Sequence, residues 1–141
     1  MISELTETAG RWSVILVDDD RSITEMYRLG LEFHGFKVAV AGSGDELFDT
    51  LGPRIPDAIV LDYELPGDKG DVVLQKIRLD ERTRAVPVFM LSNFPSTVDG
   101  AIDRVFTAGA MAWLQKAHTP PRVLAEKLVE ALSRASVREG V

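Results

Sequence analysis

The sequence predicts one α/β domain built on a doubly wound, five-stranded parallel sheet. Two observations predict it: five short apolar runs alternate with five helical patterns along the 141 residues, and only a few residues separate them. The apolar runs are rich in β-branched residues and carry little polar alternation, as in strands that are buried on both faces. Right-handed crossovers between such strands place helices on both sides of the sheet.

The five predicted strands share a short apolar core with polar or turn-forming residues at their ends. The first, SVILV, runs directly into three aspartates, and the third, DAIVLD, ends on another. In chain order the strands are residues 13–17, 36–41, 57–62, 86–91 and 111–116.

The five predicted helices have apolar residues at helical spacing and terminal signals at several ends. Asp20 is the expected cap of the first helix and Gly35 its stop. Ser43 and Gly52 bound the second helix, and Thr119 caps the fifth, with Pro120 in its first turn. In chain order the helices are residues 21–35, 43–52, 71–79, 96–110 and 119–135.

The composition is that of an ordinary globular domain, with 45% hydrophobic and 27% charged residues. A net charge of −6 argues against direct contact with a nucleic-acid backbone. The chain has no cysteine, which excludes disulfides and thiolate metal sites, and no apolar run is long enough to span a membrane. Residues 1–12 do not have the pattern of a signal peptide, so we expect a cytoplasmic protein.

We expect three parts along the chain: a flexible arm at 1–11, one folded domain at 12–136 and a short tail at 137–141. No separate output domain is expected after the fifth helix.

Carboxylates follow two strands that are neighbours in the expected strand order 2-1-3-4-5. Asp18 and Asp19 come after the first strand, and Asp62 ends the third. In doubly wound sheets, ligands bind beyond the carboxyl ends of the strands, where the strand order reverses. Three acids crowded at that edge repel one another, and a hard divalent cation offsets the repulsion. An oxygen-only site of this kind suits Mg²⁺.

Two more polar residues end the remaining central strands. Ser92 follows the fourth strand as a hydroxyl donor, and Lys116 ends the fifth as a compact cation. Carboxylates, a metal ion, a hydroxyl and a lysine are the groups that stabilise a transferring phosphoryl group. A carboxylate is itself able to act as the nucleophile and form an aspartyl phosphate.

Four stretches in this order resemble the receiver domain of bacterial two-component response regulators: ILVDDD, VLDYELPGDKG, FMLS and GAMAWLQK. The resemblance covers residues 12–136 and implies a flavodoxin-like fold. It implies that Asp62 accepts a phosphoryl group and that the two acids after the first strand hold Mg²⁺. It also implies that the backbone carbonyl of Glu64 is a further metal ligand.

The resemblance assigns roles to the later residues as well. Ser92 and Lys116 contact the phosphoryl oxygens, and Trp113 lies where the family has its rotameric aromatic switch. Ser92 belongs to the same switch. A bulky Phe94, two residues beyond Ser92, would hinder an attacking water molecule.

The chain departs from the family pattern after the fifth strand. The family usually has Lys-Pro there with a cis peptide bond, whereas Ala117 follows Lys116. A cis bond before alanine would cost several kcal/mol, so we expect a trans bond. The stretch from Ser92 to Gly109 is also slightly long for the family.

The resemblance implies a histidine kinase or a histidine phosphotransfer protein as phosphodonor. We expect a protein effector downstream, or a phosphorylation-dependent homodimer, through the face made by the fourth helix, fifth strand and fifth helix. The chain would then be a phosphoacceptor that assists its own phosphorylation and dephosphorylation, not an enzyme with a separate substrate.

Three alternatives remain. DDDRS also fits the aspartate loop of haloacid-dehalogenase-like phosphatases, but no second acidic pair follows Lys116. A flavodoxin-like nucleotide binder would need a Gly/Ser/Thr loop where the acids stand. A phosphorylation-independent adaptor would keep the fold without needing the acid set.

Overall fold

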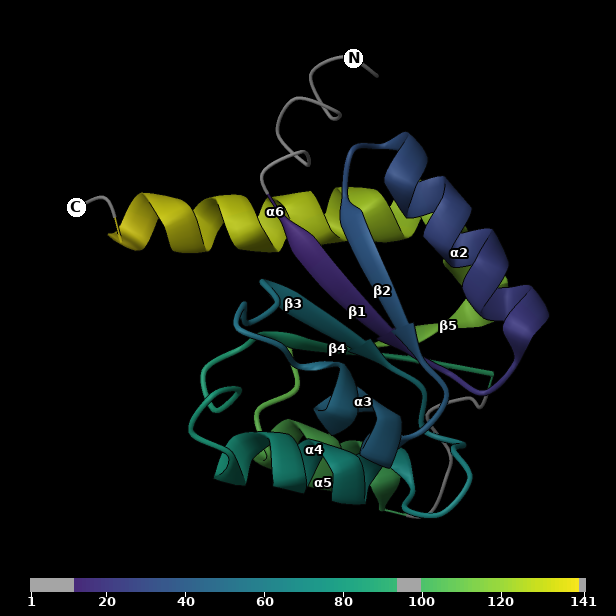
Figure 1. The fold of residues 1–141 in the computed structure, drawn as a ribbon, viewed down its shortest axis with the longest axis vertical. Helices are drawn as coiled ribbons and strands as arrows, with labels where there is room; N and C mark the ends of the chain where they lie inside the picture. The colour runs from purple at the N-terminus through teal and green to yellow at the C-terminus, as the bar shows by residue number, and fades with distance from the viewer. Residues whose placement is uncertain (1–11, 94–99, 140–141) are drawn as a thin grey trace.

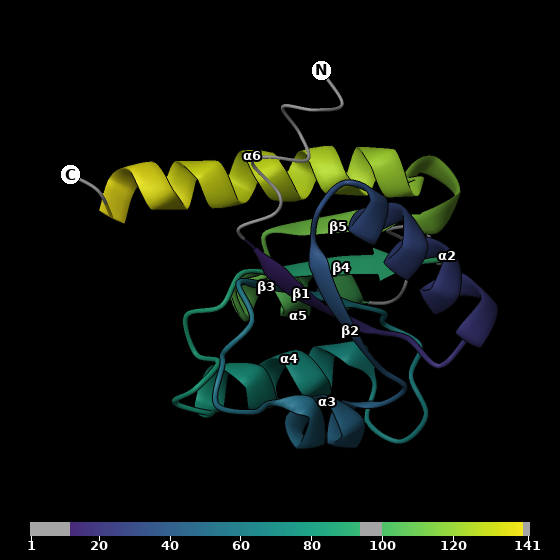
Figure 2. The ribbon, with the colours of Figure 1, turned by 45° about the horizontal axis from the view of Figure 1, so that its top comes forward.

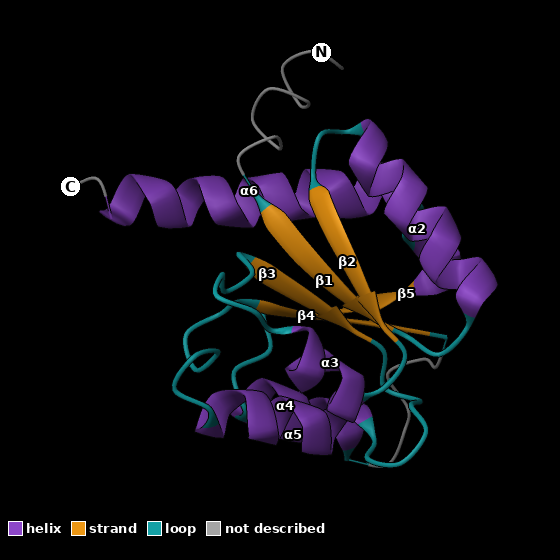
Figure 3. Cartoon of the chain, in the orientation of Figure 1, coloured by secondary structure: helices purple, strands orange, loops and turns teal. Residues whose placement is uncertain are grey.

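A computed structural model describes residues 12–93 and 100–139 of the chain. Five parallel strands form one sheet in the order β2-β1-β3-β4-β5, which confirms the predicted order. Figure 3 shows the sheet lying between two layers of helices.

The elements carry the labels of Figure 1. The strands are β1 (Ser13–Val17), β2 (Lys37–Ala41), β3 (Ala58–Leu61), β4 (Val88–Ser92) and β5 (Ala112–Gln115). The helices are α2 (Arg21–Phe33), α3 (Gly44–Thr50), α4 (Gly70–Leu79), α5 (Ala101–Thr107) and α6 (Pro121–Glu139), with a 3-10 turn, η1 (Lys116–His118), after β5.

Helices α2 and α6 cover one face of the sheet, and α3, α4 and α5 cover the other (Figures 1 and 2). The alternation of side chains along β1 explains why this strand is apolar throughout. Val14 and Leu16 pack on the side of α2 and α6, whereas Ile15 and Val17 pack on the opposite side. All four are at most 5% exposed, so both faces of the strand belong to a core.

Several predicted strand boundaries are displaced by one or two residues, and those of β4 and β5 bear on the site. β4 begins at Val88, because Pro87 has no N–H to donate to the ladder, and the strand continues through Ser92 instead of stopping before it. β5 ends at Gln115, so Lys116 lies in η1 and not in the strand.

Several helix ends also differ from the prediction, and α6 continues to Glu139, beyond the predicted end at residue 135. The carbonyl of Pro120 accepts the first helical hydrogen bond of α6, from Leu124 N–H at 3.0 Å, so Pro120 and not Thr119 stands at the cap. Pro121 is then the first helical residue, where the missing N–H is harmless. Helix α3 ends at Thr50 with Leu51 as its C-cap, before the predicted stop at Gly52.

The other predicted helix signals hold. The Asp20 side chain caps α2, and the Ser43 side chain caps α3. Gly35 follows α2 with a left-handed φ of 98°, the conformation expected of a helix-terminating glycine.

The helix predicted at 96–110 is observed as α5, which covers only Ala101–Thr107. Residues 94–99, including Phe94, lie outside the described residues, as does the predicted arm at 1–11. Within residues 12–93 and 100–139 every peptide bond is trans, which confirms the expectation for the bond after Lys116. None of the helices described there is long and apolar enough to cross a membrane.

Candidate functional site

Three carboxylates meet at the carboxyl ends of β1 and β3, as the strand order predicts. Backbone hydrogen bonds hold both strand ends: Asp18 N–H donates to the Ala41 carbonyl at 3.0 Å, and Asp62 N–H donates to the Val17 carbonyl at 2.9 Å. Asp18 and Asp62 are 7% and 6% exposed, whereas Asp19 is exposed. One carboxylate oxygen from each of the three lies within 4.8 Å of the others.

Asp20, the third aspartate of the run, has a structural role at the start of α2. Asp20 accepts hydrogen bonds from the N–H groups of Ser22 at 3.0 Å and Ile23 at 3.2 Å, which caps α2. Its own N–H donates to Asp18 Oδ1 at 2.9 Å. The cap therefore also orients the buried carboxylate that precedes it.

Lys116 supplies the positive charge of the site. Its Nζ lies 2.5 Å from Asp18 Oδ2 and 3.4 Å from Asp62 Oδ2, and its side chain is 8% exposed. The sequence predicted that Lys116 lies near Asp62, but it did not predict the shorter ion pair with Asp18. The two partners are 98 residues apart, and no local signal indicates which carboxylate the amine approaches.

The electrostatics of the site leave Asp62 unusually basic for a carboxylate. Burial raises its pKa to about 6; the charge of Lys116 opposes this rise, and Asp18 adds to it. Burial lowers the pKa of Lys116, but hydrogen bonds and charges from the two aspartates outweigh burial and raise it. At neutral pH the site therefore holds an ionised Asp62 beside a protonated amine.

The donor set fits Mg²⁺. The three clustered side chains offer only carboxylate oxygens, and one of them is exposed to incoming water and ions. The Glu64 N–H lies 3.4 Å from Asp62 Oδ1, which keeps this loop against the carboxylate. The Glu64 side chain is turned to Lys69 at 2.9 Å, and metal ligation by its backbone carbonyl stays a prediction.

Gly70, the first residue of α4, is required by the packing behind Asp62. A Cβ at Gly70 would lie 2.6 Å from the Asp62 carbonyl oxygen and 2.7 Å from the Tyr63 Cα. Real Cβ atoms do not approach backbone this closely. The glycine therefore lets α4 press directly on the loop that carries the acid.

Ser92 and Trp113 lie on the two strands beyond Asp62. Ser92 is the last residue of β4 and is fully buried. Trp113 pairs in register with Met90 on β4, and its ring lies 5.6 Å from the ring of Tyr63, tilted by 44°. The residue after Asp62 thus contacts the aromatic residue on β5.

A polar network behind this ring pair was not predicted. Arg104 on α5 contacts Asp71 on α4, with Nε 2.7 Å from Oδ2, and donates to the Tyr63 hydroxyl at 3.2 Å. Asp71 is only 9% exposed. These residues come from three separate segments, so nothing in their local sequence indicates the network.

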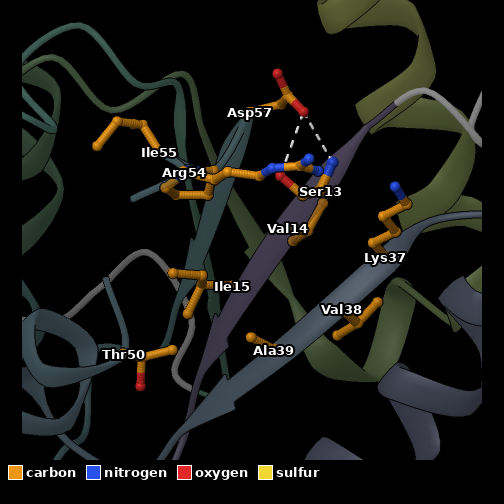
Figure 4. Close-up of a pocket in the computed structure, with 11 residues that line it drawn as sticks. Ser13, Val14, Ile15, Lys37, Val38, Ala39, Thr50, Arg54, Ile55 and Asp57 are labelled. Carbon is orange, nitrogen blue, oxygen red and sulfur yellow. Dashed lines mark hydrogen bonds between the residues drawn. The ribbon is translucent and has the colours of Figure 1, made fainter. Parts of the chain in front are cut away.

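An open hollow lies at the end of the sheet opposite the acid cluster. Figure 4 shows this open pocket of about 490 Å³ beside the amino-terminal halves of β1 and β2. Its one carboxylate, Asp57, accepts hydrogen bonds from the backbone N–H of Ser13 at 2.8 Å and from its hydroxyl at 3.3 Å. Asp57 is therefore already engaged in holding the start of β1. The clustered carboxylates and the buried lysine lie at the other edge of the sheet.

The strand order, the acid cluster and the buried lysine define a receiver-type site, and comparison with known proteins agrees. The family model of the response regulator receiver domain matches residues 14–128, so the chain belongs to this family. This assignment removes the phosphatase and nucleotide-binder alternatives.

The individual relatives are regulators from several organisms. The chain is 33% identical over 115 residues to the DNA-binding response regulator MtrA of Mycobacterium leprae, covering 82% of this chain and 49% of that protein. It is 34% identical over 125 residues to the DNA-binding dual master transcriptional regulator RpaA of a Synechocystis strain, covering 89% and 50%. The chain thus spans about half the length of these curated relatives.

Among solved structures, a putative response regulator from Chloroflexus aurantiacus superimposes with a TM-score of 0.75 at 30% identity. That alignment covers 86% of this chain and 98% of the other. A CheY-like response regulator receiver domain protein from Methanospirillum hungatei gives a TM-score of 0.80 at 25% identity, covering 90% and 98%.

Proposed function

We propose that the protein takes a phosphoryl group from a phosphohistidine donor onto Asp62. The donor would be a histidine kinase or a histidine phosphotransfer protein, since receiver domains work with such partners. The observation that carries the proposal is a buried, ionised carboxylate with a lysine amine 3.4 Å away and two further acids beside it.

An Asp62 oxygen attacks phosphorus, and the oxygen–phosphorus bond forms as the phosphorus–nitrogen bond breaks. The imidazole leaves with the bonding electron pair. Attack requires the anionic carboxylate, which a pKa of about 6 provides at neutral pH. Lys116 remains protonated and neutralises charge on the transferring group, and the Ser92 hydroxyl donates to a phosphoryl oxygen.

Asp18, Asp19, Asp62 and the Glu64 backbone carbonyl would hold Mg²⁺. When bound, the ion supplies charge neutralisation for the phosphoryl oxygens and for the crowded acids. Asp19 is the exposed member of the set and would receive the ion from solvent, while Asp18 is held by the N–H of Asp20.

The signal would leave through a protein surface. Drawing Ser92 toward the phosphoryl group opens space beside β4, and Trp113 on β5 moves to fill it. That movement reshapes the face made by α5, β5 and α6, which then binds a protein effector or a second copy of the chain. The chain would act as a phosphoacceptor that assists its own phosphorylation and dephosphorylation, and not as an enzyme with a separate substrate.

Incubation with acetyl phosphate and Mg²⁺ tests the first step. We expect one phosphoryl group per chain, labile in base, and none on Asp62→Asn. Asp49→Asn, which removes an exposed acid of α3, is the matched control and should label normally. Equal labelling of Asp62→Asn and wild type would exclude Asp62 as the acceptor.

Amide exchange with and without beryllofluoride tests the exit of the signal. We expect changed protection in α5, β5 and the start of α6. Changes confined to the loops around Asp62 would exclude this route, and would favour an adaptor that does not depend on phosphorylation.

A further inference from the structure

The turn that carries Lys116 is held to the protein at the residue that follows it. Ala117 and His118 in η1 are exposed, but Thr119 is only 3% exposed. The Thr119 N–H donates to the Lys116 carbonyl at 3.2 Å, which closes the turn. The position of Thr119 therefore sets the position of the Lys116 backbone.

A side chain from the first half of the chain holds Thr119. The hydroxyl of Tyr27, on α2, donates to the Thr119 carbonyl at 2.6 Å, and this hydrogen bond is buried. Tyr27 is 2% exposed and lines a small hollow together with Asp18 and Asp62. The phenol thus lies between the acid cluster and the turn of the lysine.

A second contact on the same face of α2 fixes the residues after the turn. A Cβ on Gly30 would lie 2.3 Å from the Pro121 Cβ, so α2 and the start of α6 touch without room for a side chain. Tyr27 and Gly30 are three residues apart and face the same side of the helix. Together they hold the segment at Thr119 and at Pro121.

This support matters because a lysine side chain is a flexible four-carbon stem whose charge is placed by its backbone. Functional groups act efficiently when their geometry is held within roughly 0.5 Å. We propose that Tyr27 positions Lys116: its hydroxyl holds the Thr119 carbonyl, and this fixes the turn from which the lysine reaches the two buried carboxylates. The kinetic consequence, but not the structural one, rests on the proposed function.

Tyr27→Phe removes the hydroxyl and keeps the ring. The matched control is Thr83→Val, which removes another buried hydroxyl whose hydrogen bond, to the Ile77 carbonyl at 2.7 Å, lies at the end of α4. In the unphosphorylated protein, we expect amide exchange at Thr119 to become about tenfold faster in Tyr27→Phe, as expected for the loss of one hydrogen bond. We expect no change at Thr119 in Thr83→Val. An unchanged exchange rate at Thr119 in Tyr27→Phe overturns the proposal.

The phosphorylation rate with acetyl phosphate and saturating Mg²⁺ gives the second readout. Tyr27→Phe should slow it by about tenfold, and Thr83→Val should leave it unchanged. In a Lys116→Met background, Tyr27→Phe should slow it no further, because the group that the tyrosine positions is already gone. A full additional loss in that background would mean that Tyr27 acts on something other than the lysine, and it overturns the proposal.

A wild-type chain that takes no phosphoryl group would refute the proposed function and leave the positioning of Lys116 open to test by unfolding. The urea midpoints of Tyr27→Phe, Lys116→Met and the double variant should then be non-additive. Additive midpoints, like an unchanged exchange rate, overturn the proposal.

Discussion

Asp62 should destabilise the metal-free protein above pH 6, and Asp62→Asn should relieve this. The folded-state pKa of Asp62 is raised from 3.8 to about 6, mainly by burial. A carboxyl group whose pKa is higher in the folded protein than in the unfolded chain stabilises the fold at pH values below the unfolded-chain pKa. This stabilisation is lost as the pH rises through the folded-state pKa. A shift of about two units corresponds to about 3 kcal/mol, which is an upper estimate.

The measurement is urea unfolding in EDTA at pH 4 and pH 8, followed by tryptophan fluorescence. At pH 4 the Asp62 carboxyl is protonated and neutral in most folded molecules. Asp62→Asn and wild type should therefore have similar free energies of unfolding at this pH. At pH 8 the variant should be more stable by about 2–3 kcal/mol. The exposed-acid control, Asp49→Asn, should differ from wild type by about the same amount at both pH values.

Added Mg²⁺ should reduce the difference in free energy of unfolding between Asp62→Asn and wild type at pH 8, because the ion binds the folded wild type and stabilises it by mass action. The reasoning is refuted if the Asp62→Asn difference in EDTA is the same at pH 4 and pH 8. It is equally refuted if the wild type is the more stable protein at pH 8 without metal.

Three further changes have defined outcomes. Lys116→Met should lower stability at pH 8 in EDTA by about 3 kcal/mol, because it leaves two buried carboxylates without their cation; urea unfolding checks this, and an unchanged midpoint would contradict it. Asp19→Ala should abolish Mg²⁺ binding, measured by calorimetry, while raising the metal-free melting temperature, since one repelling charge is gone; unchanged Mg²⁺ affinity would count against the site. Leu31→Ala should lower the free energy of unfolding by about 2–5 kcal/mol, because Leu31 lies on the inner face of α2 and is fully buried in the core; a loss below 1 kcal/mol would mean that this core collapses around the missing side chain.

The sequence alone predicted the sheet, its strand order and the acids at its edge. These features are local or follow from topology: SVILV and AIVL are apolar on both faces, and Asp18 and Asp62 directly follow their strands. Once the strand order is 2-1-3-4-5, residues at the carboxyl ends of β1 and β3 must be neighbours. Caps such as Asp20 were also predictable, because a cap bonds to residues two or three positions away.

Only the tertiary structure decided which groups touch across the site. The pairing of Lys116 with Asp18, the hydroxyl of Tyr27 on Thr119 and the contact between Tyr63 and Trp113 each join segments at least 50 residues apart. Such contacts depend on how far a turn extends and which rotamer the packing allows, and neither leaves a periodic signal in the sequence. The sequence therefore determined which chemical groups reach the edge of the sheet, and the packing of α2, α4 and α5 around that edge decided which of them hold one another in place.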